Sequence, residues 1–253
     1  MKTVRSTVGL FAVTLIATGA AAQTPAPAGQ QAPPPLTNLQ VYPKDIPRPQ
    51  LIATMQGFVA ALGVQQSGGC GYCHAGTAPQ FDWASDANPK KNVARKMILM
   101  SREITAKLPE VTGKAANEVT SLRCATCHRG VAIPKLLPDV LTETSTKSGT
   151  AAAVQQYRDL RGKYYGGQSY DFSEAALTAV ATPLINADKP DDAMTWLNLN
   201  LEFYPKSSAT YAALGQAYAK KNDTANAIKS YEKAVELDPN NQVAKRQLEQ
   251  LKK

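Results

Sequence analysis

Residues 67–76 read SGGCGYCHAG, and residues 124–130 read CATCHRG. In each stretch two cysteines stand three positions apart and a histidine follows the second; the six residues are Cys70, Cys73, His74, Cys124, Cys127 and His128. This spacing puts both sulfurs on one helical turn, where each can form a thioether with a vinyl group of a haem, and the next residue brings its imidazole under the iron. The repeated pattern therefore predicts two covalently attached c-type haems.

Two other kinds of site use paired cysteines. Four thiolates could bind zinc, but the 50 residues between Cys73 and Cys124 far exceed the usual separation of roughly 15 to 20. A thioredoxin-like dithiol at CGYC would need a surrounding βαβ pattern, which the sequence lacks, and it would not need the histidine. Haem explains both the spacing and the histidines.

The second axial ligand of each iron must come from another residue type, because the chain has only two histidines. Methionine is the usual choice in electron-carrying cytochromes c. The methionines that remain after removal of a leader are Met55, Met97, Met100 and Met194. A methionine in an apolar stripe is ordinarily core packing. Nevertheless, two irons need ligands, and the helix predicted before each motif offers Met55 in one case and Met97 or Met100 in the other.

The order of these features resembles the cytochrome c subunit of photosynthetic reaction centres. The resemblance covers residues 38–134, and besides the two motifs it is carried by NLQVYPKDI (38–46), ALGV (61–64), FDWASD (81–86) and ARKMILMSREI (94–104). It implies that each haem is held by a helix bearing the distal methionine, a turn, and a helix bearing the motif. It further implies Met55 as the ligand of the first haem and Met97 as that of the second, with Met100 in reserve.

The departures from the family pattern favour a stand-alone dihaem carrier that shares the fold. The reaction-centre subunit carries four haems in two pairs, whereas this chain has one pair, lacks a further ligating histidine and has no cysteine for a lipid anchor. We therefore expect two haems with histidine and methionine ligation and no catalytic residues.

The N-terminus predicts export. Lys2 and Arg5 precede an apolar run over residues 8–16, and three alanines end at Ala22, so residues 1–22 are expected to be a signal peptide and the protein periplasmic or otherwise exported. Residues 23–37, rich in Pro, Ala and Gln, are expected to be a disordered tether. Nothing later is long and apolar enough to span a membrane.

The net charge of +8 is concentrated in the half that carries the cysteines. Residues 23–150 hold 13 Lys and Arg against 8 Asp and Glu. No basic stripe is interleaved with stacking aromatics, so a nucleic-acid partner is not expected. The cations nearest the motifs are Lys90, Lys91, Arg95, Lys96, Arg102, Arg123 and Arg129. They could form a landing surface for an acidic redox partner, offset haem propionates, or line a solvated helix face.

The C-terminal part has a different pattern. Residues from 208 onward resemble the 34-residue tetratricopeptide repeat through Tyr211, Leu214, Gly215, Tyr218, Ala227, Tyr231, Ala234 and Pro239. A second, degenerate copy fits residues 174–207, and residues 241–253 would close the array. About two repeats are fewer than the three that an independent solenoid normally needs. They could dock a partner protein or brace the haem domain.

The sequence thus predicts a mainly α protein. A dihaem cytochrome c domain (38–134) made of helix-turn-helix haem-binding units is followed by a linker with one short helix (135–173) and an α-solenoid of about two tetratricopeptide repeats (174–253). The predicted function is electron transfer between redox protein partners, reached through the repeats or the basic haem-domain surface. Two alternatives stay open: a haem enzyme, peroxidase-like or gas-binding, with one open iron, and a repeat-based assembly protein with structural haems.

Overall fold

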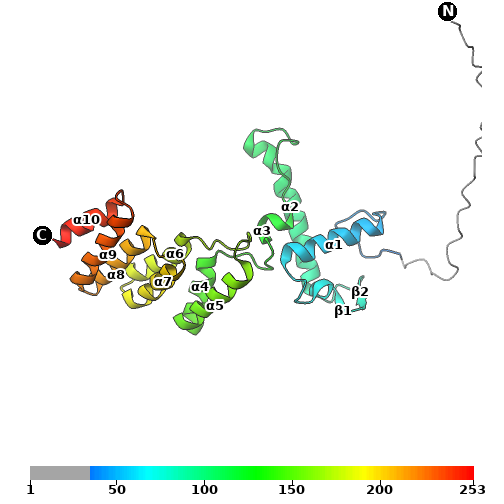
Figure 1. Cartoon of the computed structure of the whole chain (residues 1–253). Coiled ribbons are helices and arrows are strands. Elements are labelled where there is room, and N and C mark those ends of the chain that lie inside the picture. Colours follow the sequence, from blue (N-terminus) through cyan, green and yellow to red (C-terminus); the bar gives the residue numbers. More distant parts are fainter. Residues whose placement is uncertain (1–34) are drawn as a thin grey trace, which may run out of the picture. The chain divides into compact units, whose positions relative to one another are not determined.

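The computed structural model describes residues 35–253, so the predicted signal peptide and most of the predicted tether lie outside the described residues. The described chain is mainly helical, which confirms the predicted fold class (Figure 1). Its elements are α1 (Arg48–Leu62), the 3₁₀ helix η1 (Gly69–Tyr72), β1 (Ala75–Thr77), β2 (Gln80–Asp82), α2 (Pro89–Thr112), α3 (Cys124–His128), α4 (Leu137–Ser148), α5 (Thr150–Tyr164), α6 (Glu174–Asn186), α7 (Pro190–Phe203), α8 (Ser208–Lys220), α9 (Thr224–Leu237) and α10 (Gln242–Leu251).

Each Cys-x-x-Cys-His motif follows a longer helix. Helix α1 ends at Gly63, whose φ of 65° is in the left-handed region that glycine adopts without strain, and η1 with the first motif follows. A two-stranded hairpin comes next, with Ala75 paired to Asp82 and Thr77 to Gln80. Helix α2 then leads through residues 113–123 to α3 and the second motif. The order of helix, connection and motif is therefore present twice, although the second connection is the long stretch 113–123 and the first motif runs past the end of η1.

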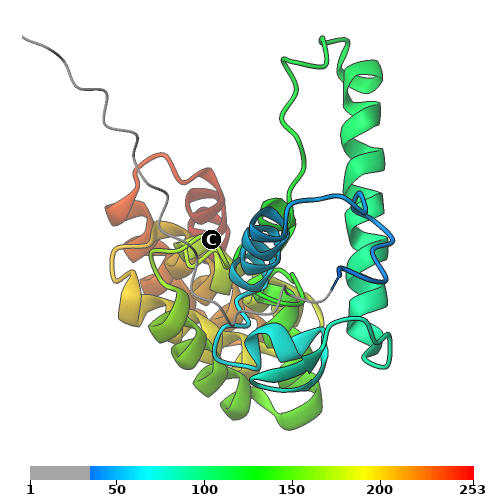
Figure 2. The same cartoon turned by 90° about the vertical axis from the view of Figure 1, so that its right-hand side faces the viewer.

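Helix α2 is the longest helix of the described chain. The Asn88 side chain caps its start by accepting a hydrogen bond from the Lys90 backbone N–H at 3.1 Å, and Pro89 occupies the first turn, where it costs no hydrogen bond. Its 24 residues correspond to about 36 Å. Figure 2 shows α2 as one long rod from whose end residues 113–123 return toward α3. This return brings the second motif back toward α1.

The end of α1 meets the end of the second motif. The Gly130 N–H donates to the Ala61 carbonyl at 2.8 Å. A Cβ atom at Gly63 would lie only 1.8 Å from the Gly130 carbonyl oxygen. The two backbones approach each other so closely because neither position carries a side chain. This contact joins the two halves of the haem-motif region.

Residues 135–173 correct one prediction. Where the sequence predicted a linker with one short helix, the structure has two packed helices, α4 and α5. Leu137 and Leu141 of α4 and Tyr157 of α5 belong to the same core as α6, α7 and α8. The α4 sequence has few apolar residues, and its helix is stabilised by packing against α6 rather than by its own propensity.

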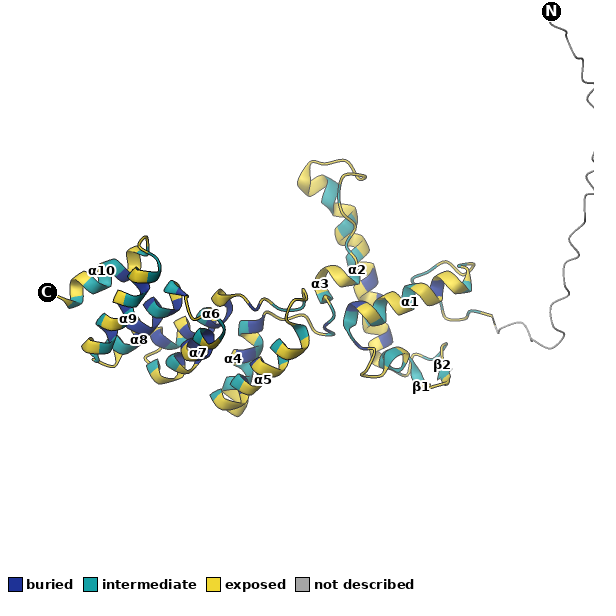
Figure 3. Ribbon diagram, in the orientation of Figure 1, coloured by how far each residue is buried: buried dark blue, intermediate teal, exposed yellow. Residues whose placement is uncertain are grey.

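The C-terminal region therefore contains three antiparallel helix pairs, α4/α5, α6/α7 and α8/α9, closed by α10. The first helices of successive pairs pack on each other, α4 on α6, α6 on α8 and α8 on α10. They begin at Leu137, Glu174, Ser208 and Gln242, so the last two steps are both 34 residues. With α4/α5 added to the two predicted repeats, the array has the three units that a solenoid normally needs. Figure 3 shows buried residues concentrated in this region.

The last repeats pack a glycine against a tyrosine ring. Tyr231 is fully buried, and a Cβ atom at Gly215 would lie 2.7 Å from its Cε1 atom. Burial raises the pKa of Tyr231 to about 12, so the ring carries a neutral hydroxyl. Helices α8 and α9 can pack this closely only because position 215 has no side chain.

Replacement of Gly215 by alanine is expected to lower the free energy of unfolding by about 2 kcal/mol, because the added methyl group overpacks a closed core. Urea unfolding followed by far-ultraviolet circular dichroism measures the change. Gly162→Ala is the matched control, since Gly162 lies inside α5 with nothing within 4 Å of its Cβ position. That variant should be neutral or more stable by up to about 1 kcal/mol. Equal effects of the two substitutions would contradict the close packing.

Candidate haem-binding sites

The first motif forms a tight helical turn. The Cys70 carbonyl accepts hydrogen bonds from the backbone N–H groups of Cys73, at 3.2 Å, and of His74, at 3.0 Å. The Asn88 side-chain amide donates to the carbonyl of Tyr72 at 3.2 Å and so holds the turn from the start of α2. The two thiols and the imidazole are thus carried on one turn, as covalent haem attachment requires.

The His74 imidazole lies in a partly buried position beside Trp83. The two ring centroids are 5.0 Å apart in an edge-to-face arrangement, and the buried Nδ1 atom has no hydrogen-bond partner. Burial lowers the pKa of His74, and the positive charges of Lys91 and Arg95 lower it further. The imidazole is therefore held neutral, which is the form that binds a metal.

The second motif is the short helix α3. The Arg123 backbone N–H donates to the Thr126 side chain at 3.0 Å and closes the first turn. The Nδ1 atom of His128 lies 3.1 Å from the Val131 carbonyl. With its proton on Nδ1, the imidazole donates to this carbonyl and keeps a lone pair on Nε2. A backbone partner of this kind is what ligating histidines normally have.

The four cysteines are free thiols; Cys70 and Cys127 are exposed, and Cys73 and Cys124 are half-buried. Burial raises the pKa of both half-buried thiols. A reactive dithiol would instead have a lowered pKa. Within residues 35–253 no three His, Cys, Asp or Glu side chains lie close enough together to bind a metal ion.

The methionines lie on the two long helices. Met55 is half-buried on α1, which packs against both η1 and α3. Met97 and Met100 are 37% and 45% exposed on α2. The structure brings α1 together with both motifs, but the pairing of each methionine with an imidazole stays a prediction.

Exposed apolar side chains follow both motifs in the chain and line one face of α2, and they test whether a haem would fit. They include Trp83 after the first motif, Ile133 and Leu136 after the second, and Val93, Met97, Met100 and Ile104 along one face of α2. Side chains of this kind are normally covered in a folded protein. Figure 3 shows how much of α2 is exposed. Together with the free thiols and the neutral His74 imidazole, this apolar lining fits a porphyrin.

Two residues of the predicted basic surface are buried. Lys91 and Arg95 are 9% and 8% exposed and bind the loop that contains Trp83 and Asp86. A partner therefore cannot reach them, and the prediction of a basic landing surface is wrong for these two. The other five cations of the cluster are exposed, and the surface remains a prediction for them.

Sequence reasoning missed three features of the sites. These are the Trp83 ring against His74, the Val131 carbonyl that orients His128, and the contact of Gly63 with Gly130. Of the three, only Trp83 was indicated by the sequence, because it belongs to the segment FDWASD (81–86) that carries the family resemblance. The other two depend on backbone positions that no residue type reveals.

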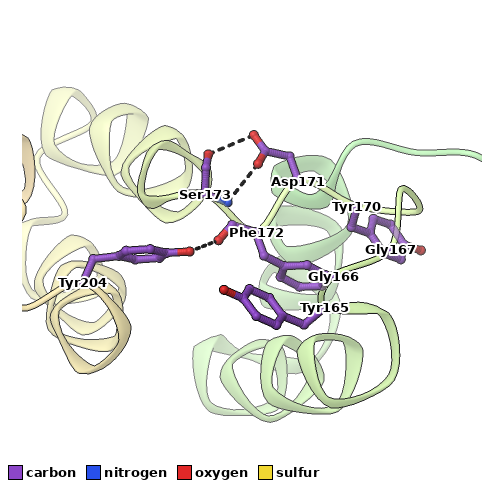
Figure 4. Close-up of a pocket in the computed structure, with 8 residues that line it drawn as sticks. All are labelled: Tyr165, Gly166, Gly167, Tyr170, Asp171, Phe172, Ser173 and Tyr204. Atoms are coloured by element: carbon purple, nitrogen blue, oxygen red, sulfur yellow. Dashed lines mark hydrogen bonds between the residues drawn. The ribbon is translucent and has the colours of Figure 1, made fainter.

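A separate hollow of about 400 Å³ lies between α5 and α6. Figure 4 shows its aromatic lining, with Tyr204 donating a hydrogen bond to the Phe172 carbonyl. Its lining residues, Tyr165, Gly166, Gly167, Tyr170, Asp171, Phe172, Ser173 and Tyr204, include no cysteine, histidine or methionine. This hollow is therefore not a haem site.

Two family models match the chain. The family described as "Photosynthetic reaction centre cytochrome C subunit" matches residues 12–177, more than half of the chain, and the tetratricopeptide repeat matches residues 208–241. The first region contains both motifs and all three candidate methionines. The second contains α8 and α9.

Solved structures similar to this chain are tetratricopeptide-repeat domains. The first such domain of Spaghetti (RPAP3), bound to an HSP90 peptide, has 20% identity and a TM-score of 0.33 over 46% of this chain and 87% of that chain. The first domain of human RPAP3 has 22% identity and a TM-score of 0.34 over 46% and 90%. The second domain of human RPAP3, in complex with an HSP70 peptide, has 16% identity and a TM-score of 0.34 over 46% and 92%.

None of the helices within residues 35–253 combines the length and the apolar character needed to cross a membrane.

Proposed function

The chain belongs to the photosynthetic reaction centre cytochrome c subunit family, which makes it a haem-containing electron-transfer protein, and we propose that it carries two covalent haems and passes single electrons between protein partners outside the cytoplasm. Family membership indicates an electron carrier rather than an enzyme. The observation that carries the proposal is the presence of two Cys-x-x-Cys-His turns, each with free thiols and a partly buried imidazole.

Each residue has a defined role in this proposal. Cys70 and Cys73 hold one haem, and Cys124 and Cys127 hold the other. His74 and His128 are the proposed proximal ligands, and the Val131 carbonyl, 3.1 Å from the His128 Nδ1 atom, would fix the orientation of that ring. Met55 and Met97 are the proposed distal ligands. A haem bound with histidine and methionine supplies a one-electron couple of raised potential.

Apolar parts of the surrounding chain would cover part of each bound haem. Helix α1 packs on both motifs, and the apolar face of α2 would lie against a porphyrin. Low polarity around an iron favours the less charged, reduced state. These features suit a carrier better than a haem enzyme.

If both irons have methionine ligands, the reduced protein should not bind carbon monoxide at neutral pH, because no coordination position is open. Absorption spectra of the dithionite-reduced protein before and after carbon monoxide addition give the answer. Rapid binding at one haem would contradict the carrier and favour the alternative of a gas-binding or peroxidase-like enzyme.

Export is part of the proposal. It is supported by the basic and apolar leader of residues 1–22. The protein purified from the periplasm of a host with a haem-attachment system should begin at Gln23. A mature protein that retains Met1, or that accumulates in the cytoplasm, would contradict the proposed export.

The repeats are proposed to bind a protein partner. The three stacked helix pairs reach the number that an independent solenoid normally needs, and arrays of this size present an extended binding face. The alternative is an assembly protein in which the repeats bind the partner and the haems are only structural. The two proposals differ in whether the haems are needed to reduce the partner protein.

A further inference from the structure

Two cations of α2 are buried one helical turn apart. Lys91 and Arg95 are 9% and 8% exposed, although lysine and arginine are almost never fully buried without partners. Their burial therefore requires an explanation from the groups around them.

The protein itself fixes both charges. The Lys91 ammonium donates to three backbone carbonyls, those of Trp83 at 2.9 Å, Ala84 at 3.2 Å and Ser85 at 2.8 Å. The Arg95 guanidinium donates to Asp86 at 2.8 Å, and also to the Asn92 side chain and the Asn38 carbonyl. Neither cation depends on a haem propionate for its position.

The loop that binds these cations also lies against His74. Trp83, whose carbonyl accepts from Lys91, packs its ring edge-to-face against the His74 imidazole at 5.0 Å. Asp86 is the carboxylate paired with both cations, at 3.2 Å from Lys91 and 2.8 Å from Arg95, and its side chain is 37% exposed. The Asp82 carboxylate of the same loop, which accepts from the Ala84 and Ser85 N–H groups, is exposed, so water screens its charge. The two buried positive charges therefore outweigh the partly hydrated Asp86, which leaves a net positive field beside His74.

The second motif has no matching pair of buried cations among the described residues, where Lys91 and Arg95 are the buried charged residues. The cations next to His128 in sequence, Arg123 and Arg129, are exposed. Water and salt screen such charges strongly. The two sites therefore differ in their electrostatic surroundings, although their motifs are the same.

We infer that Lys91 and Arg95 raise the reduction potential of the haem attached at Cys70 and Cys73 above that of the haem attached at Cys124 and Cys127, an inference that rests on the proposed function. The ferric state carries one more positive charge than the ferrous state, so a fixed positive field disfavours oxidation. In a molecule that holds one electron, these residues keep it at the first haem. Electrons then pass from the second haem to the first.

The test is a spectroelectrochemical titration of the full-length haem-loaded protein and of two variants with opposite charge changes. Arg95→Gln removes a buried cation and should lower the higher midpoint potential. Asp86→Asn removes the opposing anion and should raise it. Both variants should leave the lower midpoint in place. A merely structural effect, in which the loop loosens and admits water, would move the potential in the same direction in both variants.

Two further variants serve as controls. Arg95→Lys keeps the charge and should keep the higher midpoint near its original value. Lys107→Gln removes an equal charge from the same helix, but the Lys107 side chain is 66% exposed, so both midpoints should stay unchanged. A shift in Lys107→Gln as large as that in Arg95→Gln would overturn the inference.

The double variant Met97→Ala/Met100→Ala assigns the two midpoint potentials to the two haems. It removes both candidate ligands of the second haem, so it alters that haem alone whichever methionine is its ligand. It should move only the lower midpoint. If it moves the higher one, or if Arg95→Gln and Asp86→Asn shift potentials in the same direction, the inference is wrong while the dihaem proposal stands. Protein with fewer than two haems would instead contradict the proposed function itself.

Discussion

Met97→Ala is expected to open one iron to carbon monoxide and to remove about half of the far-red absorption band that methionine-ligated ferric haem gives. The expectation follows from the small supply of ligands, since both histidines are committed to the proximal side. Alanine has no donor atom, so the coordination position that the Met97 thioether held is left open. The reduction potential of that haem should fall as well, since the thioether stabilises the ferrous state.

Met100→Ala is the matched control for this experiment. Both residues lie on the same helix with similar exposure, 37% and 45%, so the two substitutions remove similar apolar surface. Only loss of a ligand changes the far-red band. A normal band in Met97→Ala together with its loss in Met100→Ala would make Met100 the ligand and contradict the assignment carried over from the family.

Gly63→Ala is expected to destabilise the haem-motif region by about 3 kcal/mol. Two costs combine. The residue has a φ of 65°, which costs a residue with a side chain about 1–2 kcal/mol, and its new Cβ atom would lie 1.8 Å from the Gly130 carbonyl oxygen. To remove this overlap, the backbone at the end of α1 and the backbone after α3 must move apart. Backbone atoms cannot move aside as the end of a flexible side chain can. Urea unfolding followed by haem absorption measures the loss.

Gly113→Ala isolates the contact from the backbone conformation. Gly113 ends α2 with a φ of 66°, almost the same as that of Gly63, yet nothing lies within 4 Å of its Cβ position. This variant should lose only about 1 kcal/mol. If Gly63→Ala and Gly113→Ala cost the same, the close approach of α1 to the second motif is not part of the folded protein.

The sequence carried most of the information about the candidate sites. Cysteine and histidine have narrow chemical uses, so their spacing alone predicted both motifs, and the resemblance drawn from them is confirmed by the family match. The tetratricopeptide repeat was equally readable, because its small and aromatic positions, such as Gly215 and Tyr231, recur at a fixed period.

Helix α4 shows where local pattern fails. Its sequence, LPDVLTETSTKS, has a proline in the first turn, several β-branched residues and few apolar residues. Leu137 and Leu141 are nonetheless fully buried against the rest of the repeats. The helix forms because tertiary packing outweighs a weak local preference, and no window of the sequence contains that information.

Lys91 and Arg95 show the same limit for charge. Their sequence neighbours indicated a solvated or partner-binding basic face, whereas three backbone carbonyls and one carboxylate bring both residues into the interior. Which member of a basic cluster is buried depends on loop carbonyls that have no residue signature. The difference between the two haem sites could therefore be inferred only from the structure.

The most direct test of the central claim is an intact mass measurement of the denatured protein, produced in a host that attaches haem and then extracted with acidified acetone. The account predicts that two haems remain bound to each chain, and that Cys70→Ser/Cys73→Ser and Cys124→Ser/Cys127→Ser each remove one of them. A chain that loses all of its haem on extraction, or that carries zinc in place of iron, would contradict it.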